Sequence, residues 1–594
     1  MDENKTKQTV KEKTIRICRT VADKVIQFCR SCNISWGELA YLTLIYVLLM
    51  TVNYFLFAMN GFAISYYKTW PAISCIDRLY GLYLFLMIGH FLCRRSQWYC
   101  WSLLTSHFIV LFILLGIYFT TGTFFCESIL YLVYDTTWEE TKGFISAYVS
   151  VKSILCLIGV CIAYFVPLYF AQKLYKPNKK YSLGDCWLVL AILLACIPFF
   201  TKVYQRVNEN KKISAAVEYC WKLHPLSAVY LHIAVFNKHA GEFTMEMRHR
   251  TAPEFVALQE NVKKDPPIGL LIIGESSIRS HLSIYGYQRN TTPCLLKEKD
   301  NIIAFDDTIA ILPMTITALK YWLTDMTLDN RHIKWTIFDA LKKAGYQIDI
   351  ITNQNKSGWA DSPLQMIFST ADSVTYMHEE NYSDLDHAGN REICDENLIE
   401  PFKKLLETVR NDKSGKPHLI VVHLFGSHEP FFSRYPQNYT REFLDDTSVS
   451  NLTNEYDTSV HYTDFVMGKL LDELKKLKRP GYMIYFSDHG SKCEDQDLRT
   501  PASEAATAYE IPFLIWINQR YRTAIPETFK RMKNARQVPL QADRAHYGLL
   551  EMMGLRFTQD IEAKNFLSDK YEKPPRFILE GERPYKKEVP DKAE

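Results

Sequence analysis

Residues 268–277 read IGLLIIGESS, and this stretch decides how the rest of the sequence can be interpreted. It follows two prolines and runs as an apolar, largely β-branched segment that stops at Gly274. A strand buried on both faces of a parallel sheet has this composition. Polar residues end strands routinely, but ligands of open α/β sheets bind beyond the carboxyl ends of the strands. Glu275 and Ser276 are therefore candidates for a functional site.

From residue 268 onward, short apolar runs alternate with segments of helical spacing. Strands are expected at Ile268–Ile273, Gln347–Ile351, His418–Val422, Tyr482–Phe486 and Pro512–Trp516. Helices are expected at Trp335–Ala344, Asn397–Val409 and Tyr462–Leu477. This rhythm predicts an α/β domain with a mostly parallel sheet sandwiched by helices.

Three of the expected strands end in residues that bind metals. Glu275 follows the first strand, His423 the third, and Asp488 with His489 the fourth. In a parallel sheet these side chains gather at one edge, and carboxylates with an imidazole suit zinc, which keeps one position open for catalysis. Each signal alone is weak, because Asp-His often marks a plain turn and His423 could be a hydrogen-bonded core histidine. Together they predict a metal site.

Two segments offer a nucleophile. Ser276 follows Gly-Glu at a strand end, but a G-x-S-x-G elbow is excluded because Ile278 replaces the last glycine. In PMTITAL, residues 313–319, Thr315 and Thr317 open a helical stretch, where backbone N–H groups favour a phosphate. A metal would lower the pKa of such a hydroxyl. Thr315 could instead be only the helix N-cap.

The chain of 594 residues is too long for one core, and its apolar residues are unevenly distributed. Five apolar runs precede residue 203, at Trp36–Met59, Ser74–Cys93, Trp101–Phe125, Phe144–Phe170 and Leu183–Phe200. We expect five transmembrane helices. Residues 1–34 hold eight Lys and Arg, which predicts a cytoplasmic N-terminus and an extracytoplasmic second half. A net charge of +3 gives no indication of a nucleic-acid partner.

The expected domains follow from these patterns. They are a cytoplasmic N-terminus (1–34), a transmembrane domain (35–203), a linker with a possible interfacial helix at Leu226–Phe236 (204–262), a catalytic domain (263–568) and a loosely ordered tail (569–594). The outer half has four cysteines and no C-x-x-C pair, which excludes a disulfide-built scaffold and a cysteine zinc site.

The motifs resemble those of the membrane phosphoethanolamine transferases, whose outer domain has the alkaline-phosphatase and sulfatase fold. The resemblance is carried by IIGESSIRSHLSIYGYQRNTTP, TITA, HLFGSHEPFFSRYP, NEYDTSVHYTDF and SDHG, in the order found in that family. It implies that Glu275, Asp488 and His489 bind zinc together with Thr317. Thr317 would take phosphoethanolamine from phosphatidylethanolamine, and His428 would lie near the transferred phosphate. The enzyme would lie in a bacterial inner membrane with its catalytic domain in the periplasm.

The sequence departs from the lipid A enzymes of that family. Members that act on lipid A usually have cysteines beside the nucleophile loop, a glutamate after SDHG and a histidine about a dozen residues later. Here the segment Leu312–Tyr321 has no cysteine, Ser491 follows SDHG, and residues 490–510 contain no histidine. These departures concern the handling of the acceptor and any second metal ion. The IYGYQRNTTP version resembles the branch acting on lipopolysaccharide core sugars or periplasmic glucans. Two alternatives stay open: a lipoteichoic-acid-synthase-like glycerol-phosphate transferase, and an inactive outer domain with a binding or assembly role. A sulfatase is disfavoured because no C-x-P-x-R or S-x-P-x-R sequence is present.

Overall fold

The computed structural model describes residues 151–174, 225–354, 363–378, 394–440, 442–493, 506–579 and 586–589, with isolated positions before residue 118. The chain divides into two compact units, the first with residues 1–125 and 150–235 and the second with residues 126–149 and 236–594. The last boundary falls within α11 (Pro225–His249). Helix α11 covers the helix predicted at residues 226–236. The second unit contains the sheet and all of the predicted site residues.

Most of the predicted membrane region lies outside the described residues. The fourth apolar run coincides with α8 (Val151–Leu174), whereas the first, second and fifth runs are not described and the third is described only at isolated positions. Within the described parts of the chain, no helix combines the length and the apolar character needed to cross a bilayer. The five crossings and the cytoplasmic N-terminus stay predictions.

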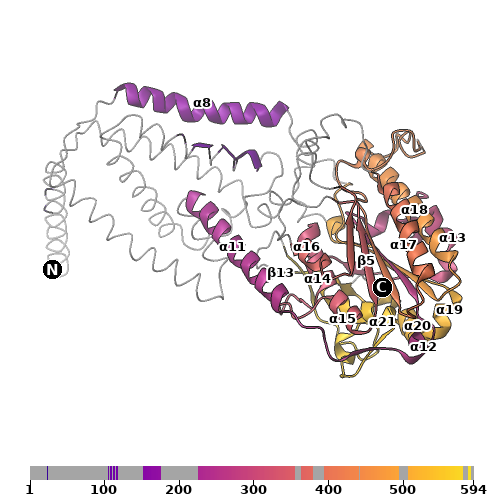
Figure 1. Ribbon diagram of the computed structural model, residues 1–594. Coiled ribbons are helices and arrows are strands. Elements are labelled where there is room, and N and C mark those ends of the chain that lie inside the picture. The colour runs from indigo at the N-terminus through magenta and orange to yellow at the C-terminus, as the bar shows by residue number, and fades with distance from the viewer. Residues whose placement is uncertain are drawn as a thin grey trace, which may run out of the picture. The chain divides into compact units, whose positions relative to one another are not determined.

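A sheet forms the centre of the second unit (Figure 1). It has seven strands in the order β3-β9-β8-β2-β7-β5-β6. Its strands are β2 (Ile268–Gly274), β3 (Ile302–Ala304), β5 (Gln347–Thr352), β6 (Ser373–Tyr376), β7 (His418–His423), β8 (Gly481–Ser487) and β9 (Phe513–Ile517). All five predicted strands are present. The central strand β2 pairs in parallel with β7 and β8, and every residue of β2 is buried, as its apolar composition predicted.

Helices cover both faces of this sheet. They are α12 (Glu260–Lys264), α13 (Pro293–Lys297), α14 (Thr315–Leu323), α15 (Ile337–Lys343), α16 (Pro363–Phe368), α17 (Ile399–Asn411), α18 (Asn451–Lys475), α19 (Gln519–Ala524), α20 (Pro526–Asn534) and α21 (His546–Met552). Alternate residues of β2 enter two separate cores: Leu271 packs with α14, α15 and α21, and Leu270 packs with α17 and α18. Figure 1 shows α17 and α18 across the sheet from α14 and α15.

Local capping explains where two predicted helices begin. Thr336 forms a capping box with Asp339, so α15 begins at Ile337. Ser450 accepts a hydrogen bond from Thr453 N, so α18 begins eleven residues before the predicted start at Tyr462. The predicted start was too late because residues 451–461 are mostly polar, yet many of them are buried against the sheet.

Three features of the second unit were not predicted. Strand β9 runs antiparallel to β8, and the short edge strands β3 and β6 were missed. Strand β1 (Val256–Leu258), within the predicted linker, pairs with β11 (Leu555–Phe557), and β4 (Thr308–Ile309) pairs with β10 (Leu540–Gln541).

The predicted loose tail is partly ordered. Strands β12 (Arg576–Leu579) and β13 (Lys586–Val589) pair with each other. The guanidinium of Arg576 donates two hydrogen bonds to Asp307, at 2.9 and 3.0 Å, and both side chains are buried. The charged, proline-rich composition of the tail did not indicate this anchor.

Candidate metal centre

The carboxyl ends of β2 and β8 bring Glu275, Asp488 and His489 together. The register pairs Gly274 with Ser487, so the residues after the two strands are neighbours. One donor atom of each of the three residues lies within 4.8 Å of the others. His489 Nε2 lies 3.3 Å from Glu275 Oε1 and 3.3 Å from Asp488 Oδ2. The juxtaposition expected from the strand ends is therefore observed, and these are ligand types that zinc accepts.

Hydrogen bonds from three elements hold the Glu275 carboxylate. Ser276 Oγ donates to Oε1, and Thr315 Oγ1 and Gln354 Nε2 donate to Oε2, each at 2.9 Å. Gln354, just after β5, was missed by sequence reasoning. Glu275, Asp488 and His489 were predicted because they are polar residues at the ends of parallel strands. The same rule also selects Gln354.

Thr315 and Thr317 occupy different environments in the first turn of α14. Met314 is the N-cap and makes no side-chain cap bond, so the interpretation of Thr315 as the N-cap was wrong. Thr315 Oγ1 contacts Glu275 and lies 3.5 Å from His489 Nε2. Thr317 Oγ1 is buried and has no hydrogen-bond partner among the described residues.

Helix α14 is fixed to the sheet close to the metal ligands. Its Trp322 stacks on Phe486, with ring centroids 4.0 Å apart and planes 8° from parallel. Because Phe486 lies two residues before Asp488, the same contact sets the helix against the strand end that supplies two of the three donors. Such stacking adds to the free energy of simple area burial.

The two other predicted histidines lie beside the cluster. His423 is fully buried, its Nδ1 lies 3.1 Å from Thr352 Oγ1, and its Nε2 has no partner among the described residues. Burial lowers the pKa of His423 to about 4, so its ring is neutral. The Nδ1 of His428 lies 2.6 Å from the Glu429 carbonyl oxygen. Within the described residues His428 makes no hydrogen bond to the three candidate ligands.

The loop between these histidines packs directly on Glu275. Asp395 accepts hydrogen bonds from the backbone N–H groups of Phe425 and Gly426, each at 2.8 Å. Gly426 has φ +54°, and a Cβ there would lie 2.7 Å from the Glu275 carbonyl oxygen. The glycine of the GSH element therefore permits the close approach of the two backbones.

The electrostatics of the cluster favour a bound cation. Burial and the neighbouring Glu275 charge raise the pKa of Asp488 to about 7. Burial opposes the charged form of His489, but the two carboxylates outweigh it and raise its pKa to about 9. Burial also opposes ionisation of Glu275, yet the hydrogen bond and charge of His489 lower its pKa. Asp488 Oδ2 accepts no hydrogen bond in the described structure, which leaves it available for a metal ion.

Known proteins share this domain. The sulfatase family model matches residues 267–552. The phosphoethanolamine transferase EptC of Escherichia coli K12 is 26% identical over 438 residues, which are 70% of this chain and 73% of that protein. A solved structure of the integral membrane protein lipooligosaccharide phosphoethanolamine transferase A from Neisseria meningitidis is similar, with a TM-score of 0.57, 17% identity, and coverage of 88% of this chain and 98% of that one.

A further solved structure matches a smaller share of the chain. It is the C-terminal periplasmic domain of EptC from Escherichia coli in complex with Zn, with a TM-score of 0.49, 24% identity, and coverage of 57% of this chain and 96% of that one. The family resemblance predicted from the motifs is confirmed by the sequence matches to EptC and to the sulfatase family model.

Replacing Gly426 by alanine should weaken metal binding. The added Cβ would press on the Glu275 backbone and force a left-handed alanine, which costs roughly 1–2 kcal/mol. We expect the zinc dissociation constant, measured by chelator competition, to rise at least tenfold. Gly415→Ala is the matched control, because Gly415 is also left-handed (φ +69°) but a Cβ there meets nothing within 4 Å. Equal effects of the two substitutions would show that the contact with Glu275 is irrelevant.

Zinc binding should release protons and tighten as pH rises. The pKa of His489 is about 9 and that of Asp488 about 7. At pH 6 a metal ion must therefore displace a proton from each group, whereas at pH 9 Asp488 is already ionised and His489 is only about half protonated. Titration calorimetry in buffers of different ionisation enthalpy measures this release directly. An affinity that is constant from pH 6 to 9 would contradict the proton competition.

Proposed function

We propose that this chain, a relative of the membrane phosphoethanolamine transferases, transfers phosphoethanolamine from phosphatidylethanolamine to an envelope glycan or a lipopolysaccharide core sugar. The observation that carries the proposal is the cluster of Glu275, Asp488 and His489 facing the first turn of α14, where two threonine hydroxyls lie. This combination suits transfer of a phosphoryl group to and from a hydroxyl. A covalent phospho-threonine would be the intermediate.

The residues present fit a zinc ion. Glu275 and Asp488 would supply oxygen ligands and His489 a nitrogen ligand. Asp488 Oδ2, which accepts no hydrogen bond among the described residues, supports this assignment. Zn²⁺ bound there would neutralise charge on the phosphoryl oxygens and lower the pKa of a threonine hydroxyl. The Glu275 hydrogen bonds from Ser276 and Gln354 would fix the carboxylate in its binding orientation.

Thr317 is the proposed nucleophile. Its oxygen would attack the phosphorus of phosphatidylethanolamine, the bond from phosphorus to the diacylglycerol oxygen would break, and diacylglycerol would leave with a proton. An acceptor hydroxyl would then attack the same phosphorus and release Thr317, which regains its proton. Two observations support Thr317: the TITA motif, and a buried hydroxyl with no partner in the described structure. The direct contact of Thr315 with Glu275 makes Thr315 the competing candidate.

The two neighbouring histidines would support the reaction without forming a covalent bond to the substrate. His428, half-buried beside Phe425, would donate a hydrogen bond to an oxygen of the transferred phosphate. His423 is held neutral by burial and would fill the region behind Glu275. A second metal ion is not part of the proposal, because Ser491 replaces the glutamate found after SDHG in the lipid A enzymes.

The proposed setting is the periplasmic side of a bacterial inner membrane, with the N-terminus in the cytoplasm. A lipid donor and the apolar runs before residue 203 are consistent with this location. The motif IYGYQRNTTP supports a core-sugar or glucan acceptor over lipid A.

The nucleophile can be identified by intact-protein and peptide mass spectrometry. Incubation of the purified chain with phosphatidylethanolamine should add one phosphoethanolamine group, and the modified peptide should carry it on Thr317. Thr317→Ala should lose the adduct and reduce transfer by at least a thousandfold, because no other group takes over the attack.

Thr315→Ala is the matched control within the same turn. We expect it to retain the adduct, with transfer reduced about tenfold through loss of the hydrogen bond to Glu275. An adduct on Thr315, or on Ser276, would contradict the assignment.

Headgroup labelling separates this function from glycerol-phosphate transfer. Donor lipid labelled in ethanolamine should label the envelope glycans, and phosphatidylglycerol labelled in its headgroup glycerol should not. The reverse pattern would favour the lipoteichoic-acid-synthase type. Absence of label from both donors would favour an inactive binding or assembly protein.

A further inference from the structure

We infer that Tyr456 and Ser276 are positioning residues for the metal centre, with the hydroxyl of Tyr456 holding the backbone at Ser276 in a left-handed turn that orients Glu275 and Asp488. The inference rests on the proposed metal site but concerns residues that do not bind the ion.

Ser276 is the one non-glycine residue with a positive φ in the part of the chain that the structure describes, at 57°. Side chains with a Cβ rarely adopt this conformation, because the Cβ crowds the carbonyl oxygen. Such strain persists only where surrounding contacts impose it, and it concentrates at functional sites.

The strained turn makes two contacts with the candidate ligands. The N–H of Ser276 donates to Asp488 Oδ1 at 3.1 Å, and its Oγ donates to Glu275 Oε1 at 2.9 Å. Ser276 thus links a ligand from β2 to a ligand from β8. The left-handed φ of Ser276 sets the direction of its Cβ and of its carbonyl group, so an extended conformation there would displace Oγ from Glu275 and the carbonyl oxygen from Tyr456.

The hydroxyl of Tyr456 spans the turn. It accepts a hydrogen bond from Ile278 N at 2.7 Å and donates one to Ser276 O at 2.9 Å. Because the same oxygen binds the chain on both sides of Ser277, it fixes the peptides after the strained residue. Burial raises the pKa of Tyr456 well above its usual value, so the phenol keeps the proton that it donates.

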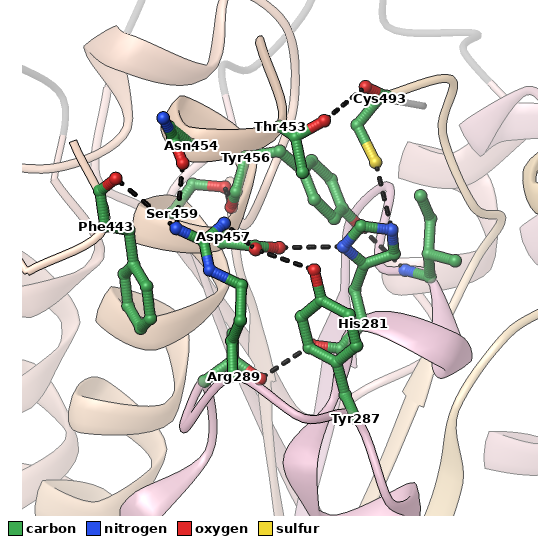
Figure 2. A network of polar contacts seen from close by, with 12 residues as sticks. His281, Tyr287, Arg289, Phe443, Thr453, Asn454, Tyr456, Asp457, Ser459 and Cys493 are labelled. Carbon is green, nitrogen blue, oxygen red and sulfur yellow. Dashed lines mark hydrogen bonds and ion pairs between the residues drawn. The ribbon is translucent and has the colours of Figure 1, made fainter. Parts of the chain in front are cut away.

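Further polar contacts connect helix α18 to the neighbouring segments (Figure 2). Next to Tyr456, the buried carboxylate of Asp457 lies 2.7 Å from His281 Nδ1 and accepts a hydrogen bond from the Tyr287 hydroxyl at 2.9 Å. His281 Nε2 lies 3.4 Å from the sulfur of Cys493, four residues beyond His489.

One turn before Tyr456 in the same helix, Thr453 Oγ1 donates to the Cys493 carbonyl oxygen at 3.0 Å. Helix α18 therefore contacts the segments after both strand ends, the one after Glu275 and the one after His489.

The test measures zinc affinity of the full-length chain by chelator competition, together with thermal unfolding of the metal-free protein. Tyr456→Phe removes both hydrogen bonds and should raise the zinc dissociation constant about tenfold. Tyr521→Phe is the matched control: its hydroxyl is also buried and donates to a backbone carbonyl, that of Met552, but it follows β9 at the edge of the sheet opposite the site. It should leave zinc affinity unchanged.

A double-mutant cycle separates the turn from general packing. Glycine adopts a left-handed φ without strain, so in a Ser276→Gly background the loss from Tyr456→Phe should fall from about tenfold to less than threefold. Equal losses in both backgrounds would overturn the inference. So would a Tyr456→Phe protein that loses thermal stability as Tyr521→Phe does but binds zinc normally.

Zinc affinity also distinguishes failure of the proposed function from failure of the positioning role. A wild-type chain that binds zinc but transfers no phosphoethanolamine would contradict the proposed function and leave the positioning role standing. A wild-type chain that binds no zinc would overturn both.

Discussion

Two carboxylates cannot be buried side by side without a positive charge between them. Glu275 and Asp488 are each about 1% exposed or less, and both lie against the ring of His489. The free-energy cost of burying such a pair is large unless a proton or a metal ion compensates it. The raised pKa values of His489 and Asp488 show that the cluster favours bound protons. A divalent metal ion would supply more positive charge at the same place. The surrounding structure holds the carboxylates together against their repulsion.

The contacts that hold Glu275 and Asp488 together come from elements far apart in the chain. Parallel pairing of β2 with β8 brings the strand ends together, and Gly426 lets its loop reach the Glu275 backbone. Helix α18 contacts the segments after both strands. On the opposite face, stacking of Trp322 on Phe486 fixes the threonine-bearing helix. The donor atoms are therefore positioned by packing and hydrogen bonding in addition to anything a metal ion contributes.

Sequence reasoning succeeded where a local pattern determines the outcome. The apolar runs gave the five inner strands, and the rule that parallel strand ends meet gave Glu275, Asp488 and His489. It did not give the direction of β9, because an apolar run reads the same in either direction. It also missed the polar first half of α18. Hydroxyl-bearing side chains that are buried and hydrogen-bonded cannot be distinguished from surface residues by sequence alone.

The strained backbone at Ser276 also could not be predicted from a local sequence pattern. A serine after Gly-Glu carries no signal of a left-handed conformation, because the cause lies 180 residues away at Tyr456. The choice between Thr315 and Thr317 depends on side-chain placement within a single helical turn, which hydrophobic periodicity does not determine. Thr317 is preferred as the nucleophile because of the resemblance to a family. Thr315 is the alternative because its hydroxyl contacts Glu275.

The buried pair of Asp307 and Arg576 has a consequence for synthesis. Asp307 precedes the threonine loop and also lies 3.8 Å from Arg279, so one carboxylate joins the segment after Glu275 to the C-terminal strands. The two partners lie 269 residues apart in the sequence, so this ion pair cannot form during synthesis until Arg576 has left the ribosome.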